Sequence, residues 1–576
     1  MVWILLLALG CHTPTDKRAT ESGDAGCAAG LDMNDDGVCD HDVADWSRGA
    51  TIAEGENRAN IYDLDEDDLL AARTAGLKHA FYWPVPTTRM LLPLDALRTV
   101  FTDPDAEVVR QVLETATGFR DEAGMYDRMG LSAFPETQGD VGSAYWAPPP
   151  PGQGPGDPMG ATWLDTDEGL GLTFSCAACH IDTLFGRPVM GLQNKRPRPN
   201  ALFHVARTAL AAVDGETFQQ LTDATDGERA MYERTVVALR AVGTREPETL
   251  GLDTSLAQVA GSLARRNDDA EASFDPFLED NPRAMLLDDV IGDSKPMPWW
   301  TMRYKTRWLS DGSIVSGNPI LTNFLWNELG RGADLVELQE WLESDAGMRV
   351  VDELTVAIFA NEAPRWTDFF GADSIDEDRA REGQAHFAER CTACHGTYEK
   401  GWDADDADNL DAEARLATTV VRYHAQTPRV DVGTDSGRAT AMVDLEQLNG
   451  LTISAWAETT VDAGETGYVP PPLDGIWARY PYFHNNAAPT LCDVLRAPAN
   501  RTMFYVQGPA DDPATDFDAE CVGYPTGEAI PGPWLDDTEA HVTLGGPGQG
   551  VSGHDEMLDG MDDDERLAIV EFLKTL

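Results

Sequence analysis

The chain has 576 residues, and 99 acidic residues against 43 basic ones give it a formal net charge of −56. Such a surface repels nucleic acid and anionic lipid, which excludes proteins that bind either through a basic face. We interpret the acidic surface as a solvated coat, and the alternative is that it docks a basic partner protein. Hydrophobic residues make up 42% of the chain, enough for the cores of several domains.

The first eleven residues form an apolar run that ends at a cysteine. The run is too short to cross a bilayer, and no later stretch is long and apolar enough to do so. Residues 1–11 resemble a bacterial lipoprotein signal. Cleavage of such a signal would make Cys11 the new N-terminus, and Cys11 would be acylated. The run departs from that pattern because no Lys or Arg precedes it and because Ala8 stands where a larger aliphatic residue is usual. The alternative is an ordinary cleaved secretory signal. Both predict export, to the periplasm or as an outer-membrane lipoprotein held to the membrane only by its lipid.

Residues 12–50 are predicted to be a tether followed by an Asp-rich loop. The loop reads Asp32-Met33-Asn34-Asp35-Asp36-Gly37-Val38-Cys39-Asp40, with oxygen ligands at alternate positions and Gly at the turn. This spacing predicts calcium bound by Asp32, Asn34, Asp36 and Asp40. Val43 stands where a complete calcium loop has its bidentate Glu. The loop is therefore closer to short extracellular calcium loops, and the alternative is a solvated acidic turn.

Residues 51–360 are predicted to form an N-terminal domain with several helices. Apolar residues at three-to-four spacing indicate helices over Asp105–Thr117, Glu228–Val242 and Leu335–Phe359. Leu77–Pro93 is aromatic and proline-containing, which favours strand or loop over helix. The proline-rich residues 147–158 predict an irregular loop.

Residues 361–576 are predicted to form a C-terminal domain bounded by two helices. The first covers Asp378–Arg390, and the second covers Met561–Leu576, with acids at its start and Lys574 near its end to complement the helix dipole. An N-terminal helix that crosses a C-terminal helix is typical of cytochrome c folds. Both could equally be ordinary amphipathic helices, but the motif between them makes that unfavourable.

That motif is a Cys-x-x-Cys-His pentapeptide, and the chain contains two copies. They are Cys176-Ala-Ala-Cys179-His180 and Cys391-Thr-Ala-Cys394-His395. In such a motif two thiols add to the vinyl groups of one haem, and the adjacent histidine becomes an axial ligand of its iron. A single copy could be chance or half of a zinc site. Two copies predict two covalently attached haem c groups, with iron on His180 and His395.

The nine cysteines are fully accounted for by these assignments. Four hold haem and one is acylated. The remaining four pair by proximity in the sequence as Cys27–Cys39 and Cys492–Cys521. Two disulfides fit an oxidising, exported compartment.

The segment from Leu473 to Leu491 carries a resemblance to a known family. It reads Leu-Asp-Gly-Ile-Trp-Ala-Arg-Tyr-Pro-Tyr-Phe-His-Asn-Asn-Ala-Ala-Pro-Thr-Leu. Its Pro-Tyr-Phe-His run resembles the bacterial di-haem cytochrome c peroxidase superfamily, and Leu-x-Gly-Ile-Trp-Ala is closer to the di-haem rubber oxygenase-like branch. The resemblance implies a mainly α fold, with two cytochrome c-like haem domains, long loops and few short strands.

The resemblance also implies further ligands. The peroxidases place a methionine shortly after this segment, but Cys492–Asn500 contains none. The rubber oxygenase-like branch places a histidine just before the last helix, where His554 stands, so we expect His395 and His554 to ligate the C-terminal haem. His484 is then expected near that haem without ligating it. The alternative for His554 is a surface histidine in a Gly-rich loop.

The N-terminal haem has no clear second ligand in the sequence. His204 is a candidate, but an open position that binds oxygen or hydrogen peroxide is the better expectation. Trp299, Trp300 and Trp308 are candidates for an aromatic wall or an electron relay. Trp300 best matches the family's aromatic position, and we expect it to be catalytic together with His180. Core packing is the alternative for each tryptophan.

These features predict an exported di-haem c-type cytochrome oxidoreductase. The C-terminal haem would relay electrons from a small donor protein or a small-molecule reductant, and the N-terminal haem would react with oxygen or peroxide, as in a peroxidase. One alternative is a non-enzymatic periplasmic electron-transfer cytochrome, which a second ligand on the N-terminal haem would favour. Another is an oxygenase that cleaves an apolar polyene, which a dry aromatic channel would favour.

Overall fold

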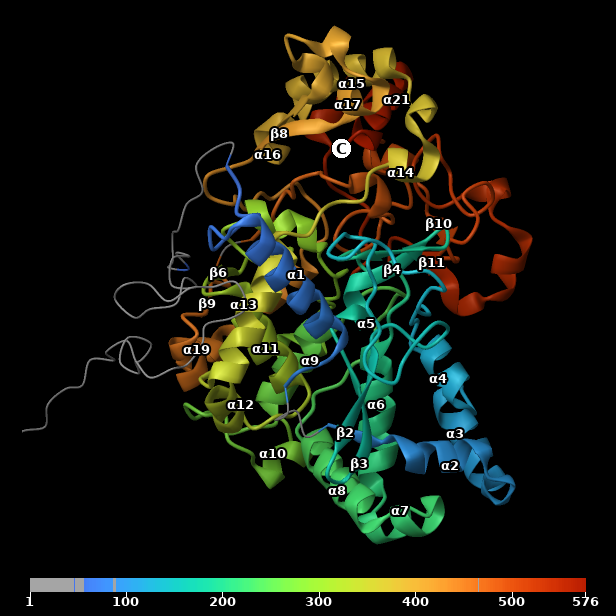
Figure 1. Ribbon diagram of the computed structural model, residues 1–576, viewed down its shortest axis with the longest axis vertical. Helices are drawn as coiled ribbons and strands as arrows, with labels where there is room; N and C mark the ends of the chain where they lie inside the picture. Colours follow the sequence, from blue (N-terminus) through green and yellow to red (C-terminus); the bar gives the residue numbers. More distant parts are fainter. Residues whose placement is uncertain (1–45, 47–55, 86–89, 465) are drawn as a thin grey trace, which may run out of the picture.

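The computed structural model describes residue 46 and residues 56–85, 90–464 and 466–576 (Figure 1). The described chain is mostly helical with short strands, as predicted. None of its helices is long and apolar enough to cross a membrane. The predicted signal, the Cys27–Cys39 disulfide and the calcium ligands Asp32, Asn34, Asp36 and Asp40 lie outside the described residues.

The helices of the first part of the chain fill the lower half of the view in Figure 1. Most begin at an Asp, Ser, Thr or Asn whose side chain accepts a backbone N–H of the first turn. They are α1 (Glu66–Phe81), α2 (Leu94–Thr102), α3 (Glu107–Thr117), α4 (Glu122–Arg128), α5 (Ala177–His180), α6 (Pro199–Ala209), α7 (Gly215–Thr222), α8 (Asp226–Arg240), α9 (Ser255–Ala264), α10 (Pro276–Asp280), α11 (Pro319–Gly330), α12 (Leu335–Leu342) and α13 (Asp345–Phe359).

Most of the labelled helices of the second part gather at the top of the same view around the C-terminus, whereas Thr452–Trp456 (α19) lies lower, beside Leu335–Leu342 (α12). They are α14 (Thr367–Phe370), α15 (Glu377–Arg390), α16 (Thr392–His395), α17 (Ala412–Leu416), α18 (Gly437–Ala441), α19 (Thr452–Trp456), α20 (Leu491–Val494) and α21 (Asp563–Lys574). A 3-10 segment, η7 (Trp299–Tyr304), lies between α10 and α11 in the sequence.

The strands are short and form small antiparallel sheets. One sheet has the order β1-β3-β2, and the others are pairs. The strands are β1 (Leu92–Pro93), β2 (Ala161–Thr166), β3 (Gly169–Phe174), β4 (Ile181–Leu184) with β5 (Arg187–Met190), β6 (Ile314–Ser316) with β9 (Thr460–Val461), β7 (Thr397–Lys400) with β8 (Thr418–Arg422), and β10 (Phe504–Val506) with β11 (His541–Thr543).

The predicted helices are confirmed as α3, α8, α15 and α21, with two differences elsewhere. The stretch Leu335–Phe359 is two helices, because the Ser344 hydroxyl accepts from the backbone N–H of Gly347 and starts α13 anew. The expectation of strand or loop for Leu77–Pro93 is wrong for its first five residues, which end α1. Burial of Leu77 and Phe81 in the core outweighs the local aromatic preference for extended structure.

Glycines allow two pairs of helices to cross at close range. A Cβ added at Gly76 of α1 would overlap the carbonyl of Glu353 in α13, and one at Gly383 of α15 would overlap the carbonyl of Ala568 in α21. In each pair the helices are far apart in the sequence, so the crossing brings distant parts of the chain into contact. The second crossing matches the predicted contact between the two bounding helices of the C-terminal domain.

Substitution of Gly383 by alanine should therefore destabilise this crossing. The new methyl group must push α21 away, at a cost of about 3 kcal/mol, which exceeds the gain in helix propensity of about 1 kcal/mol. Urea unfolding followed by circular dichroism should show an earlier transition. Gly450→Ala is the matched control, because no heavy atom lies within 4 Å of its Cβ position. An unchanged transition in Gly383→Ala would contradict the close crossing.

The buried apolar residues form two large clusters that interlock. The first holds α9, α11 and α13 together and includes Ala441–Val461 from the second half of the chain. The second holds α15 and α21 and includes Leu184, Val189 and Trp300 from the part of the chain before residue 360. Trp299 belongs to the first cluster and Trp300 to the second, so this dipeptide lies where the clusters meet. The domain boundary at residue 360 stays a prediction.

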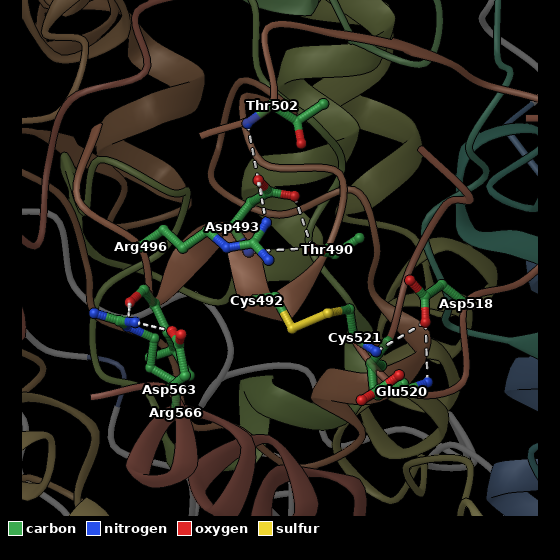
Figure 2. The surroundings of a disulfide bond; sticks show 12 residues. Thr490, Cys492, Asp493, Arg496, Thr502, Asp518, Glu520, Cys521, Asp563 and Arg566 are labelled. Carbon is green, nitrogen blue, oxygen red and sulfur yellow. Dashed lines mark hydrogen bonds and ion pairs between the residues drawn. A yellow bond between two sulfur atoms is a disulfide. The ribbon is translucent and has the colours of Figure 1, made fainter. Parts of the chain in front are cut away.

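The predicted disulfide between Cys492 and Cys521 is present (Figure 2). Hydrogen bonds fix the backbone beside each cysteine. The Thr490 hydroxyl accepts from the backbone N–H of Asp493, and the Asp518 carboxylate accepts from that of Cys521. The bridge therefore ties α20 to the long loop that follows it.

Candidate haem sites

The first pentapeptide lies on the wall of a large internal cavity, which we call the His180 cavity. Cys176, Cys179 and His180 all line it. One turn of helix turns the three side chains to the same side, because the backbone N–H of His180 donates to the Cys176 carbonyl at 3.0 Å. The two thiols are unpaired, and burial raises the pKa of Cys176 to about 11.

The His180 ring is held by the segment that leads into η7. The Trp299 ring lies 5.6 Å from it, centre to centre, at 35°. The backbone N–H of Gly191 donates to the His180 carbonyl, and that of Trp299 donates to the Gly191 carbonyl. Burial lowers the pKa of His180 to about 4, against an opposing contribution from the Met297 carbonyl. The imidazole is therefore neutral at pH 7, the form that ligates a metal.

The rest of the His180 cavity is largely aromatic and aliphatic. One face of α11 runs along it through Pro319, Ile320, Asn323, Trp326 and Asn327, and further side chains include Trp83, Phe203, Trp308, Gln258 and Asp253. Among the described lining residues His180 is the one histidine, and the methionines are Met297 and Met302. His204 does not line the cavity; its Nδ1 lies 3.2 Å from the Thr244 hydroxyl.

The second pentapeptide lines a separate cavity, the His395 cavity. Cys391, Cys394 and His395 face it from the turn that follows α15. The Nδ1 of His395 is 2.8 Å from the Pro471 carbonyl, which fixes the tautomer and leaves Nε2 for a metal. Burial lowers the pKa of His395, so this ring is also neutral.

His554 faces His395 across the same cavity. The two ring centres are 6.4 Å apart and the ring planes differ by 10°. A metal–imidazole bond of about 2 Å on each side, plus about 1.2 Å from each ligating nitrogen to its ring centre, gives about 6.4 Å. The spacing thus fits one iron between two imidazoles. Burial, together with the nearby His395, lowers the pKa of His554 to about 3.

Three residues that the sequence did not single out hold His554 in place. The Phe483 ring lies 5.3 Å from the His554 ring at 17°. The Arg501 guanidinium lies over the Phe483 ring, 5.0 Å from its centre. Arg501 also donates to the carbonyls of Val551 and Gly553, beside His554. The Asn485 side chain donates to the carbonyls of Gly548 and Gly550. Within the Tyr-Phe-His-Asn run, Phe483 contacts the His554 ring and Asn485 holds the loop that precedes it.

His484 lines the His395 cavity but does not face His395. Its ring stacks on Tyr468 with centres 4.1 Å apart, and its carbonyl accepts from the backbone N–H of Lys295 at 2.8 Å. Burial, with Arg438 and Lys295 nearby, lowers the pKa of His484 to about 3. This position agrees with a residue beside the haem rather than with a ligand.

The His395 cavity also contains buried cations with no acid beside them. Lys295, Lys305 and Arg479 line it, and within the described chain none of them forms an ion pair. Lys295 donates to the carbonyls of Arg479 and Pro481, while Nε and Nη1 of Arg479 have no partner. Burial lowers the pKa of Arg479 to about 10 and those of both lysines well below their usual value.

In a chain of net charge −56, unpaired buried cations indicate a missing anion. Haem carries two propionates, and the lining of the cavity combines thiols, histidines and these cations. The donor set of the His395 cavity thus fits haem c.

The two cavities share part of their walls. Lys295, Pro296, Met297 and Ser310 line both. Trp300 lines neither; its indole N–H donates to the Asp474 carbonyl at 2.7 Å. Of the three candidate tryptophans, Trp299 and Trp308 line the His180 cavity and Trp300 does not; the aromatic wall and a catalytic role of Trp300 stay predictions.

Part of this region is similar to a known protein family. Residues 467–506 match a family model described as RoxA-like, cytochrome c-like. This stretch contains Phe483 and Asn485, which hold His554. The match shows a cytochrome c-like region, and with it covalent haem c and the iron of a c-type cytochrome.

Two proteins of Sinorhizobium fredii (strain NBRC 101917 / NGR234) are similar to about a third of this chain. "Uncharacterized protein y4iJ" is 26% identical over 265 residues, which is 37% of this chain and 41% of that protein. "Uncharacterized protein y4iM" is 28% identical over 195 residues, which is 32% of this chain and 42% of that protein. The chain thus matches about two fifths of the length of each relative.

Proposed function

We propose that the protein is an exported di-haem oxidoreductase of the di-haem cytochrome c peroxidase superfamily, in which the two haems have different tasks. Bound haem supplies an iron that exchanges electrons and, where one axial position is open, binds an oxygen species. The observation that carries the proposal is the asymmetry of the cavities. His395 faces a second histidine at 6.4 Å, whereas the described lining of the His180 cavity offers no second histidine.

In the His395 cavity His395 and His554 would hold the iron, Pro471 fixes one imidazole, and Phe483 packs against the other. Lys305 and Arg479 would pair with the propionates. An iron held by two histidines would exchange electrons rather than bind substrate, so this site would relay electrons from a small donor protein or a small-molecule reductant.

In the His180 cavity His180 would hold the iron, and side chains of α9 and α11 line the space beside it. Trp83, Trp308 and Trp326 would exclude water, while Asn200, Gln258 and Asp253 would supply hydrogen bonds for oxygen or peroxide. Lys295–Met297 lies in the wall that the two cavities share. Hydrogen peroxide reduction is the reaction that we propose first.

Two alternatives each have an observation in their favour. The tryptophans along the His180 cavity favour an oxygenase that cleaves an apolar polyene. Met302, which also lines this cavity, favours a non-enzymatic electron carrier if its sulfur occupies the second axial position. The Cys492–Cys521 disulfide supports export, because such bonds persist in oxidising compartments.

Absorption spectra of the holoprotein test this assignment. We expect two haems per chain, one low-spin and one high-spin, and a rapid spectral change of the high-spin haem on addition of peroxide. Cys176→Ala combined with Cys179→Ala should remove the peroxide-reactive haem and leave the low-spin one. Two low-spin haems that do not respond to peroxide would favour the carrier instead.

A further inference from the structure

A surface groove lies on the side of η7 that faces away from the His180 cavity. Its lining includes Tyr304, Glu362, Trp366, Asp474 and Lys574. In this groove an ionisable pair is buried that the proposed function does not use. The Asp474 carboxylate lies beside the Tyr304 hydroxyl in the lining of the groove, and only 7% of Tyr304 is exposed.

The pair is connected to both haem cavities through its neighbours in the chain. Lys305, the residue after Tyr304, lines the His395 cavity, as do Leu473 and Ile476 on either side of Asp474. The backbone carbonyl of Asp474 accepts from Trp300, whose neighbour Trp299 lies against His180. The groove is thus one residue away from the wall of the relay site.

The surroundings of the pair favour loss of an electron from Tyr304 only together with loss of its proton. Burial and the Asp474 charge raise the pKa of Tyr304 far above its usual value, so the phenol does not ionise by itself. Burial also raises the pKa of Asp474, although Tyr304, Arg303 and Lys400 oppose the shift. The carboxylate is therefore a better base than an exposed one, and it lies beside the phenol in the same groove.

We propose that Tyr304 and Asp474 form the electron-entry site of the protein, at which a small neutral phenolic reductant in the groove is oxidised. This proposal rests on the proposed reduction of peroxide. The net charge of −56 disfavours anionic reductants and leaves neutral ones such as hydroquinone.

The step balances as follows. The Tyr304 O–H bond breaks, its proton goes to Asp474, and its electron goes toward the His395 cavity. The reductant then gives a hydrogen atom to the Tyr304 oxygen, and Asp474 releases its proton to water in the groove. Two such rounds convert hydroquinone to quinone and deliver the two electrons and two protons that reduce hydrogen peroxide to two waters.

Freeze-quench electron paramagnetic resonance of the holoprotein mixed with peroxide tests the proposal. We expect a radical signal that narrows when the protein is made with ring-deuterated tyrosine. Tyr304→Phe should abolish that signal and slow hydroquinone oxidation about tenfold or more. Asp474→Asn keeps the shape of the side chain but takes no proton, so it should weaken the signal and slow oxidation as well.

The control is Tyr232→Phe, which removes a buried hydroxyl that donates to the Leu210 carbonyl, outside the linings of the groove and of both cavities. It should change neither signal nor rate, and haem content should be equal in all variants. An unchanged tyrosyl signal and rate in Tyr304→Phe overturn this proposal alone. A wild-type protein whose haems do not react with peroxide overturns the proposed function and this proposal with it.

Discussion

Replacement of His554 by alanine should convert the C-terminal haem from low spin to high spin. The His395 and His554 rings are spaced for one iron between them, and no other histidine in that cavity faces His395. Without His554 the iron loses its sixth ligand and becomes five-coordinate or binds water. We expect about one haem equivalent per chain to change in the absorption spectrum.

Imidazole and a matched variant make this result specific. Added imidazole should enter the space left by the side chain and restore the low-spin spectrum. His204→Ala should leave both haems unchanged, because His204 contacts Thr244 and lines neither cavity. A His554→Ala spectrum identical to that of the wild type would contradict the ligand assignment.

Replacement of Arg479 by methionine should lower the reduction potential of the C-terminal haem. The variant leaves a propionate uncompensated, and its negative charge stabilises the oxidised iron. A unit charge about 10 Å from the iron at an effective dielectric constant of about 20 changes the energy by about 1.7 kcal/mol, or roughly 70 mV for one electron. A spectroelectrochemical titration measures the shift.

The matched control is Arg496→Met. Arg496 is 42% exposed and pairs with Asp493 at 3.5 Å, so water screens its charge and the potential should hardly change. Equal potentials in Arg479→Met and the wild type would show that Arg479 does not pair with the haem.

The covalent part of the site was predictable because it is local in the sequence. Two cysteines and a histidine within one helical turn must share a face, and the pentapeptides line their cavities as this spacing implies. The Cys492–Cys521 pairing followed from proximity. His554 was found only through a resemblance, since nothing in its own neighbourhood marks a ligand.

The supporting residues were not predictable, because their contacts join distant parts of the chain. Phe483 and His554 are separated by a disulfide-bridged loop, and Arg501 meets the loop of His554 only in the folded protein. Lys295 and Arg479 look like surface residues in the sequence. Their burial follows from the packing of the two clusters. The mistaken expectation of strand or loop at Leu77–Phe81, which end α1, has the same cause, because tertiary burial decided the outcome.

The shared wall of the two cavities has a consequence for how the protein accepts electrons. Lys295–Met297 borders both, so in the proposed di-haem protein the charge of one iron would act on the other across this shared wall. The first electron to arrive would make the second harder to add. The two centres would therefore fill anticooperatively, and the half-reduced molecule would be populated over a wide range of ambient potential.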